Sequence, residues 1–430
     1  MKPNNIITIL LLLLIVSCND TPKKITSSTD YNVYLNADDD EMLQLTIEDY
    51  KFWEKKLEKE PSQFPYLIKA AASQSHLFSK TGRIELLIEA ENKLIKANKA
   101  TNYSKSAYLR SLAHNYISQH RFNESLKLLK KAEAIGDNLE VTQKMLFDVH
   151  LELGNFELAK SYLDKFSNDN SDFDYLIRLS KWSDHRGNLE AAIKYMEQAK
   201  EIAESSNLPA TKQWVYTNIA DYYGHAGRIK DSYNHYLKAL SIDNNDAYAK
   251  KGIAWILYSY EKNANEALRI LNSITTSYNA PDYYLLKAEI AEFQGDSNLQ
   301  EEQIKLYKSA VQNEFYGDMY NKYNVLLYAE ENIETEKALK IAQTEIKNRP
   351  TPQSYDLLAW TYYKYGDATE ALDIMEKYVV GKTYEPEVLF HLAQVYKANG
   401  KKDEAKNLKK ELLESAFELG PLVALKIKNI

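Results

Sequence analysis

The single cysteine of the chain, Cys18, is the residue whose chemistry is most restricted by its surroundings. It follows an apolar run from Ile6 to Val16 that only Thr8 interrupts, and one positive side chain, Lys2, precedes the run. Because the chain has one cysteine, its thiol cannot form a disulfide within the chain. A thiol can instead form a thioether bond. The run itself is too short to cross a bilayer as a helix, which takes roughly 20 apolar residues.

A charged start, an apolar run and a small residue before the cleavage point are typical of a secretory signal peptide, predicted here for residues 1–17. The sequence Ile15-Val16-Ser17-Cys18 resembles the lipobox of bacterial lipoproteins. The resemblance implies that the chain is cut before Cys18 and that this cysteine receives acyl chains such as palmitate. Several acyl chains give stable anchoring, where one chain binds only marginally. The alternative is an ordinary cleaved signal peptide with an incidental cysteine.

The stretch after the apolar run is polar, so residues 18–37 are expected to form the lipidated cysteine and a flexible tether. In enterobacterial lipoproteins an Asp directly after the cysteine favours retention in the inner membrane, and here that residue is Asn19. We therefore expect a lipid-anchored protein of the bacterial cell envelope, at the outer membrane. The sequence leaves open whether it faces the periplasm or the cell surface.

Other short motifs that could carry chemistry lack residues that the chemistry needs. "GKT" at 381–383 resembles the end of a phosphate-binding loop, but Glu376 stands where that loop needs a glycine. "NADDDE" at 36–41 has Glu41 where a calcium loop needs a glycine. The eight His form no HExxH pair, and the sequence has no GxSxG motif. The sequence therefore predicts no catalytic residue, no cofactor and no metal site, and a protein that is not an enzyme.

The composition is that of a mildly acidic, helix-rich protein. Without residues 1–17, which hold one of the 54 basic residues and none of the 61 acidic ones, the net charge is 53 − 61 = −8. This balance argues against a nucleic-acid partner, which would favour a basic surface. The 13 Gly and 10 Pro are few for 430 residues, since average usage is about 7% and 5%. The 33 Tyr are many and call for an explanation.

A spacing pattern recurs along most of the chain. Ala359 is followed by an aromatic residue three positions later, a glycine seven later and an alanine twelve later, and the same order begins at Ala393, 34 residues on. In the copy that begins at Ala254, the later alanine, Ala267, comes one place late. The remaining copies, complete or partial, begin at Ser75, Ala113, Phe147, Ser180, Ala220, Ala288 and Leu326.

This pattern resembles the tetratricopeptide repeat, whose unit has 34 residues and two antiparallel helices. The small residue and the aromatic would share one face of the first helix, and the glycine would end that helix. The resemblance implies an all-α fold, a right-handed superhelical solenoid of about ten helix-turn-helix repeats. We place a capping helix at residues 38–64, the solenoid at 65–417 and a C-terminal tail at 418–430.

The concave surface of such a solenoid is the candidate binding site. The residue after each small position points about 100° away from the packing face, because an α-helix has 3.6 residues per turn. These residues and their neighbours would form a groove in which aromatics alternate with acids, suited to an extended or helical peptide. Packing between neighbouring repeats is the alternative role for each aromatic. The predicted groove residues are Trp214, Asp221, Trp255, Tyr258, Glu289, Phe293, Trp360 and Tyr363.

The leading functional interpretation is a protein-protein interaction scaffold that binds an envelope protein or peptide in this groove. Its lipid anchor would attach it to the membrane. A second hypothesis is a glycan- or nutrient-binding lipoprotein that partners an outer-membrane transporter. Such lipoproteins in Bacteroidota carry similar helices but interrupt them with long loops, whereas the loops here are short. A third hypothesis is an assembly factor for outer-membrane proteins, which would have the same fold and a different client.

Overall fold

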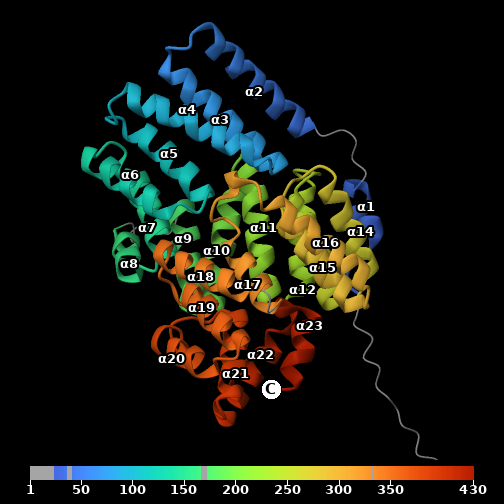
Figure 1. The fold of residues 1–430 in the computed structure, drawn as a ribbon. Helices are drawn as coiled ribbons and strands as arrows, with labels where there is room; N and C mark the ends of the chain where they lie inside the picture. Colours follow the sequence, from blue (N-terminus) through green and yellow to red (C-terminus); the bar gives the residue numbers. More distant parts are fainter. Residues whose placement is uncertain (1–23, 36–40, 166–171, 332–333) are drawn as a thin grey trace, which may run out of the picture.

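The computed structural model describes residues 24–35, 41–165, 172–331 and 334–430, and within these residues every regular element is a helix. Figure 1 shows the helices stacked as a coiled array in which blue, green, yellow and red segments follow one another. The predicted all-α fold is confirmed. The proposed signal peptide and Cys18 lie outside the described residues.

The described residues contain ten antiparallel helix pairs, which we call repeats 1 to 10. In each repeat the first helix (helix A) packs against the second (helix B), and in most repeats helix B also packs against helix A of the next repeat. The pairs are α3 Phe64–Thr81 with α4 Ile84–Ala100, α5 Ser106–Ser118 with α6 Phe122–Ile135, α7 Leu139–Glu152 with α8 Phe156–Asp164, α9 Phe173–His185 with α10 Leu189–Ser205, α11 Pro209–His225 with α12 Ile229–Leu240, α13 Ala247–Trp255 with α14 Ala264–Thr275, α15 Asp282–Gln294 with α16 Ser297–Ala310, α17 Asn321–Glu330 with α18 Thr335–Asn348, α19 Pro352–Tyr365 with α20 Ala368–Tyr378, and α21 Pro386–Ala398 with α22 Lys402–Glu414.

The residues of the repeat pattern have the roles that their types predict. Ala359 and Ala393 are fully buried, so the two helices of each pair can approach closely there. Gly366 ends its helix with φ +97°, a left-handed conformation that glycine adopts at little cost. The two weakest copies are out of register, because Ser75 and Leu326 are only half-buried and the fully buried residues stand one position earlier, at 74 and 325.

Repeat 6 shows why its pattern carries one extra residue. Its first helix, α13, continues as a π-helix, η1, over Ile256–Tyr260. The hydrogen bonds of a π-helix span one more residue than those of an α-helix, and such single-turn insertions are frequent at functional sites. The insertion lies between Ala254 and Ala267, which are 13 residues apart where other repeats have 12, and both alanines are fully buried. The π-turn therefore keeps the packing register of the repeat in spite of the added residue.

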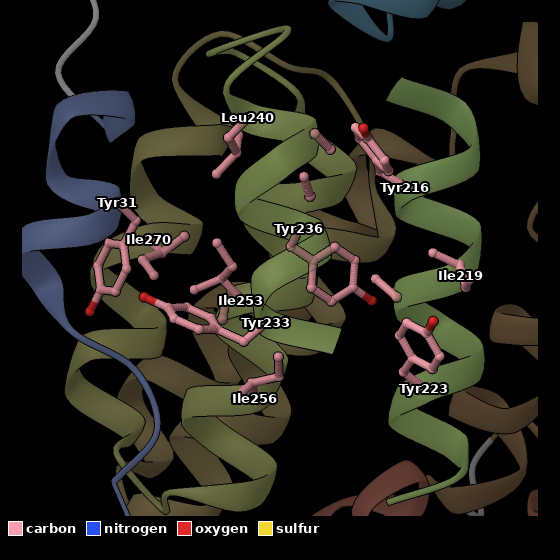
Figure 2. Packing of buried hydrophobic residues seen from close by; sticks show 14 of the residues in the cluster. Tyr31, Tyr216, Ile219, Tyr223, Tyr233, Tyr236, Leu240, Ile253, Ile256 and Ile270 are labelled. Atoms are coloured by element: carbon pink, nitrogen blue, oxygen red, sulfur yellow. The ribbon is translucent and has the colours of Figure 1, made fainter. Parts of the chain in front are cut away.

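The abundant tyrosines bridge the core and the rim of the solenoid. Figure 2 shows Tyr223, Tyr233 and Tyr236 among buried aliphatic residues of repeats 5 and 6. Their rings are 2–5% exposed, while their hydroxyl groups reach acceptors; Tyr223, for example, donates to Glu197 Oε1 at 2.7 Å. Tyrosine suits this place because its ring fills the gap between helices and its hydroxyl finds a polar partner.

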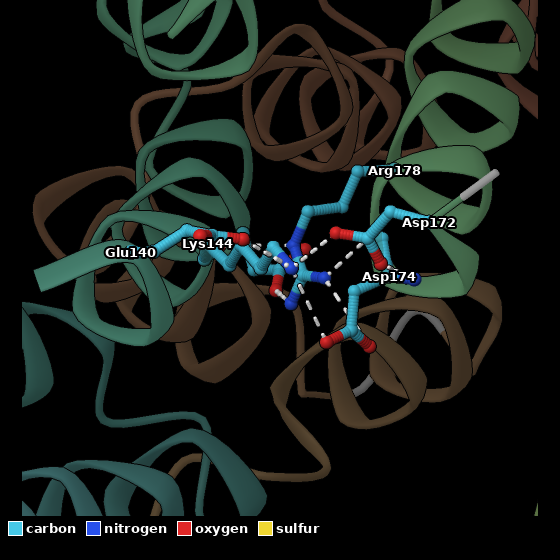
Figure 3. A network of polar contacts seen from close by, with 6 residues as sticks. Glu140, Lys144, Asp172, Asp174 and Arg178 are labelled. Atoms are coloured by element: carbon cyan, nitrogen blue, oxygen red, sulfur yellow. Dashed lines mark hydrogen bonds and ion pairs between the residues drawn. The ribbon is translucent and has the colours of Figure 1, made fainter. Parts of the chain in front are cut away.

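Between repeats 3 and 4 a polar network adds to the apolar contact. Figure 3 shows Lys144 of α7 reaching Asp172 at the start of α9, and Arg178 of α9 reaching back to α7. Lys144 Nζ lies 2.7 Å from Asp172 Oδ2, and Arg178 Nη2 lies 2.7 Å from Asp148 Oδ2. Lys144 is 8% exposed, and burial lowers its pKa less than its carboxylate partners raise it, so the net shift is upward.

The solenoid winds back on itself. The turns between helix A and helix B of repeats 1 to 3 therefore contact the segments that connect later repeats to one another. Figure 1 shows the orange α18 and α19 beside α7 and α9. Lys80 of repeat 1 also pairs with Asp243 after α12. Three contacts join early and late repeats directly. Asn279 N donates to Thr81 O at 2.9 Å, and Asn123 Nδ2 donates to Asn348 O at 3.0 Å. Arg349 Nη1 lies 3.4 Å from Glu152 Oε2. Repeats five or six places apart are therefore in direct contact.

The structure corrects the expected flexible tether. Within residues 18–37, the described part, residues 24–35, is folded and includes helix α1, Ser28–Leu35, which packs on α12 and α14. No sequence pattern indicates this helix, because it is short and its burial depends on one side chain, Tyr31, which is 2% exposed. The expected capping helix corresponds to α2, Glu41–Lys59, which packs on α3.

The structure also corrects the expected C-terminal tail. Residues 416–428 form α23, Ala416–Lys428, which contacts α22 and α21 but also η1, α11 and α15. At Gly420 the backbone turns out of helical geometry, with φ +78° and ψ +165°. This kink, followed by Pro421, lets the helix cross from repeat 10 to repeats 5 to 7. Among the described residues, the helices include none that is long and apolar enough to cross a membrane.

A pair of glycine substitutions tests whether contact between distant repeats stabilises the fold. Gly82→Ala would place a Cβ 2.4 Å from the backbone oxygen of Asn279, whereas Gly295→Ala, at a similar positive φ, would meet nothing within 4 Å. We expect Gly295→Ala to cost about 1 kcal/mol for the left-handed backbone, and Gly82→Ala to cost about 1–3 kcal/mol more for overpacking. Urea unfolding followed by circular dichroism measures both. Equal midpoints would show that the contact contributes nothing.

A candidate binding cavity on the concave surface

A cavity of about 820 Å³ lies on the concave side of repeats 6 to 10. The A helices of these repeats supply most of its wall, and α23 closes one side. Tyr323, Trp360 and Tyr363 give it an aromatic lining, and carboxylate and ammonium groups surround them. The charged residues that line it are Glu289, Glu292, Glu330, Glu385, Glu387 and Glu418 with Lys322, Lys364, Lys397 and Lys426.

Two further cavities adjoin this one at a shared ion pair. A cavity of about 430 Å³ extends toward repeat 5 and one of about 350 Å³ toward repeats 3 and 4, and all three are lined by Lys322 and Glu387. Lys322 Nζ lies 2.6 Å from Glu387 Oε2, and both side chains stay accessible from the cavity, at 51% and 42%. Burial disfavours the ionised Glu387, but the Lys322 ammonium group brings its pKa below the usual value.

The wall formed by α23 is fixed to the π-helix of repeat 6. Trp255 Nε1 and Ser259 Oγ both donate to the main-chain oxygen of Phe417, at 3.1 Å and 2.6 Å. Gly420 lies against the Trp255 ring, so closely that a Cβ there would be 3.0 Å from the ring. At the far end of the helix, Ile427 is fully buried in one cluster with Trp360. The two donors that hold α23 thus come from the end of α13 and from the π-turn that follows it.

The structure brings together five of the eight predicted groove residues. Trp255, Glu289, Trp360 and Tyr363 line the cavity of 820 Å³, and Asp221 lines the adjoining cavity of 430 Å³. Asp221 accepts hydrogen bonds from two tyrosine hydroxyls, those of Tyr236 at 2.5 Å and Tyr248 at 2.7 Å.

The other three predicted residues lie elsewhere. Tyr258 is 0% exposed and belongs to the hydrophobic core, where Phe293 packs against it with ring centroids 5.5 Å apart. The prediction that Tyr258 lines an open groove is therefore wrong, whereas Phe293 is half-buried and lines none of the three adjoining cavities. Trp214 is 43% exposed but lines a separate cavity of about 550 Å³ beside α2 and α3.

Trp360 is held in the cavity wall by stacking on two neighbouring rings. Its ring stacks on His391 at 3.9 Å and on Tyr363 at 5.0 Å between centroids. His391 Nδ1 in turn lies 2.9 Å from Asp356 Oδ2, and burial raises the pKa of the Asp356 carboxyl. The described residues hold no group of three or more His, Cys, Asp or Glu that could bind a metal ion. The contact with Asp356 holds the His391 imidazole where it stacks on Trp360.

Several carboxyl groups on this surface are hard to ionise. Burial raises the pKa of Glu289 from 4.5 to about 7, although Tyr258 donates to it at 3.0 Å. Burial raises the pKa of Asp184 to about 6, and that of Glu418 also rises. Neighbouring carboxylates, Glu385 among them, add to both shifts. Since six acidic and four lysine residues line the main cavity, a ligand that brings positive charge would relieve this repulsion.

Comparison with protein families identifies two of the repeats from sequence. The tetratricopeptide repeat model matches residues 215–246 and 386–418, which correspond to repeats 5 and 10. The other eight helix pairs in the described residues have the same helix-turn-helix arrangement, and most of the ten pairs begin about 34 residues apart. The chain is a tetratricopeptide repeat protein. Such TPR folds typically serve as non-catalytic scaffolds for protein-protein interaction.

Solved structures that match this chain include human and bacterial proteins. A human IFIT1 dimer with PPP-AAAA is 13% identical over 73% of this chain and 71% of that one, with a TM-score of 0.47. A tetratricopeptide repeat protein from Parabacteroides merdae is 16% identical over 58% of this chain and 94% of that one, with a TM-score of 0.39. A structure of pilF from Pseudomonas aeruginosa is 15% identical over 50% of this chain and 96% of that one, with a TM-score of 0.37. No curated protein matches the sequence. At these identities and scores the likenesses carry no argument about function.

Sequence reasoning about TPR repeats missed the cavity residues that lie outside the repeat pattern. Lys322 and Glu387 stand at the N-terminal ends of α17 and α21, three or more residues before any pattern position. Leu419 and the other α23 residues enter the site from beyond the last repeat. The one available signal was the displaced alanine of repeat 6, which marked the π-turn that holds α23.

Replacing Glu289 tests the electrostatics of the TPR cavity. The folded protein keeps the Glu289 proton up to pH about 7, while the unfolded chain releases it near 4.5. Folding therefore loses stability as the pH rises from 4.5 to 7, and Glu289→Gln removes this loss. We expect thermal unfolding to show the variant gaining about 2 kcal/mol over the wild type between pH 5 and pH 8. Glu301→Gln, at an exposed position of α16, is the control. If the stability of Glu289→Gln varied with pH in parallel with that of the wild type, the raised pKa assigned to Glu289 would be wrong.

The seat of α23 can be tested at its kink. Gly420→Ala forces a side chain into a glycine-only conformation and against Trp255 and Glu289. We expect a cost of about 1–3 kcal/mol, which local detachment of α23 would relieve. Amide hydrogen exchange in residues 422–428 should therefore accelerate roughly tenfold or more. Leu425→Ala, at a side chain that is 53% exposed on the same helix, should leave exchange unchanged. Protection of α23 in Gly420→Ala equal to that of the wild type would show that the kink does not hold the helix.

Proposed function

We propose that the protein is a membrane-anchored TPR lipoprotein that acts as a protein-protein interaction scaffold in the bacterial cell envelope. The observation that carries the scaffold role is the cavity of about 820 Å³ on the concave side, whose wall includes four of the predicted groove residues. A cavity of this size, with aromatic walls and a few charged groups, has the character of a binding site. The proposed anchor is Cys18, for which the sequence Ile15-Val16-Ser17-Cys18 is the support.

The chemistry of the cavity favours a peptide segment with basic and apolar side chains. Carboxylates outnumber lysines on its wall, and the net charge of the mature chain is negative. The same balance disfavours nucleic acid, whose phosphates require basic surface. Lys364 already lies over the Trp360 ring, 5.0 Å from its centroid, so a cation of the chain itself fills part of the aromatic wall.

Purification of the lipidated, full-length protein from its own envelope in mild detergent, followed by mass spectrometry, tests the scaffold role. The informative variant is Tyr323→Ala, because this side chain lines two of the cavities and is 38% exposed, so its loss should barely affect folding. Tyr365→Ala is the matched control, since Tyr365 is 64% exposed and lines none of the cavities described above.

We expect a protein partner that is recovered with wild type and Tyr365→Ala and reduced at least tenfold with Tyr323→Ala, about 1.4 kcal/mol of binding free energy. A partner that both variants retain equally would overturn the cavity assignment. If no protein partner is recovered and sugars raise the melting temperature instead, the glycan-binding hypothesis takes its place, because a ligand that binds only the folded state stabilises it.

A further inference from the structure

The segment that precedes the repeats, residues 24–35, is docked on the outside of the solenoid. It lies against α12 and α14, the B helices of repeats 5 and 6, and Figure 1 shows α1 beside α14. Fixing a backbone costs about 1–2 kcal/mol per residue in conformational entropy. A short segment stays docked only if specific contacts offset this cost, and this segment makes several.

The first contacts hold the extended residues before α1. The main-chain N–H groups of Ile25 and Thr26 both donate to Glu261 Oε1, each at 2.6 Å, and Thr26 Oγ1 donates to Glu261 Oε2 at 3.0 Å. One carboxylate thus binds two successive residues of the segment. Hydrogen bonds to a charged acceptor are about twice as strong as neutral ones. Ser27 N donates to the Tyr233 hydroxyl at 3.2 Å and extends the attachment to α12.

The second set of contacts holds α1 itself. Tyr31 is 2% exposed, and Figure 2 shows its ring packed beside Ile270 and Tyr233. Its hydroxyl donates to Glu266 Oε1 at 2.7 Å. Arg269 Nη2 donates to Asn32 Oδ1 at 2.5 Å. Repeats 5 and 6 therefore present a shaped seat with an aromatic slot and two anchoring carboxylates.

The docking limits how far a lipid on Cys18 can stand from the solenoid. Cys18 and Lys24 are six residues apart, which spans at most about 20 Å of extended chain. Without docking, the free length would reach to α2 at residue 41, 23 residues from Cys18, or about 80 Å. A long tether would let the solenoid take any orientation, whereas a short one attached to one face fixes which side meets the bilayer.

We infer that the outer face of α12 and α14, where residues 24–35 dock, is the surface that the protein turns toward the lipid bilayer; this inference rests on the proposed lipidation of Cys18. The B helices separate that face from the A helices that line the cavity, so the cavity is kept on the side away from the lipid. Val33, which is 67% exposed on α1, offers the bilayer an apolar side chain.

Energy transfer to labelled lipids tests this orientation. The lipidated full-length protein is reconstituted in vesicles of phosphatidylethanolamine and phosphatidylglycerol that carry an acceptor dye on the headgroup. Because the natural cysteine is Cys18, one donor dye can be attached to a single introduced cysteine, at Asn272→Cys on α14 or at Ser161→Cys on α8, both exposed. We expect transfer from position 272 to exceed that from position 161 at least twofold.

Releasing the docked segment should abolish the difference. Tyr31→Ala empties the aromatic slot and should make transfer from the two positions equal, while Val33→Ala, on the exposed side of the same helix, should leave the difference in place. Equal transfer from both positions in the otherwise unaltered protein would overturn the inference. Flotation with the vesicles separates this result from a failure of the anchor itself: Cys18→Ser must abolish flotation, and if the serine variant still floats, the proposed lipidation is wrong and the orientation loses its basis.

Discussion

The close approach of two helices at one small residue is the constraint on which the structure depends. In most repeats a fully buried small side chain on helix A lets helix B pack directly against it, as at Ala359 and Ala393. A single pair cannot bury its remaining apolar faces, so each pair must stack on the next. Repetition of this contact sets the curvature, and the curvature brings repeats five or six places apart into contact. The concave cavity follows, because it is the space that the inner helices enclose when the array returns on itself.

The recurring part of the fold could be predicted from sequence because its information is local. Small residue, aromatic and glycine lie within one helix and its end, so their spacing specifies the helix pair without knowledge of its surroundings. The strongest copies, such as those at Ala359 and Ala393, also have their small residue fully buried. At Ser75 and Leu326, where the pattern is weak, the register is one residue off.

The rest of the site could not be predicted because it depends on contacts between residues far apart in the chain. Whether an aromatic near the pattern faces solvent or core depends on the next repeat, so Tyr258 is buried while Trp255, three residues earlier, lines the cavity. The positions of α1 and α23 depend on seats formed by repeats 5 to 7. These two segments carry no repeat signal, and both meet the solenoid at its middle. The offset at Ala267 was visible in the sequence, but only the structure relates it to a π-turn and to α23.

The closure of the superhelix has a mechanical consequence. An open TPR array behaves as a soft spring, since each repeat touches only its neighbours and small rotations add up along the chain. Here hydrogen bonds and ion pairs such as Arg349–Glu152 connect one coil to the next, so stretching or unwinding the array requires these contacts to break together. The aperture of the concave surface is therefore close to fixed in width. Selection among clients would rest on whether a segment fits that rigid opening, and elastic adjustment of the scaffold would contribute little.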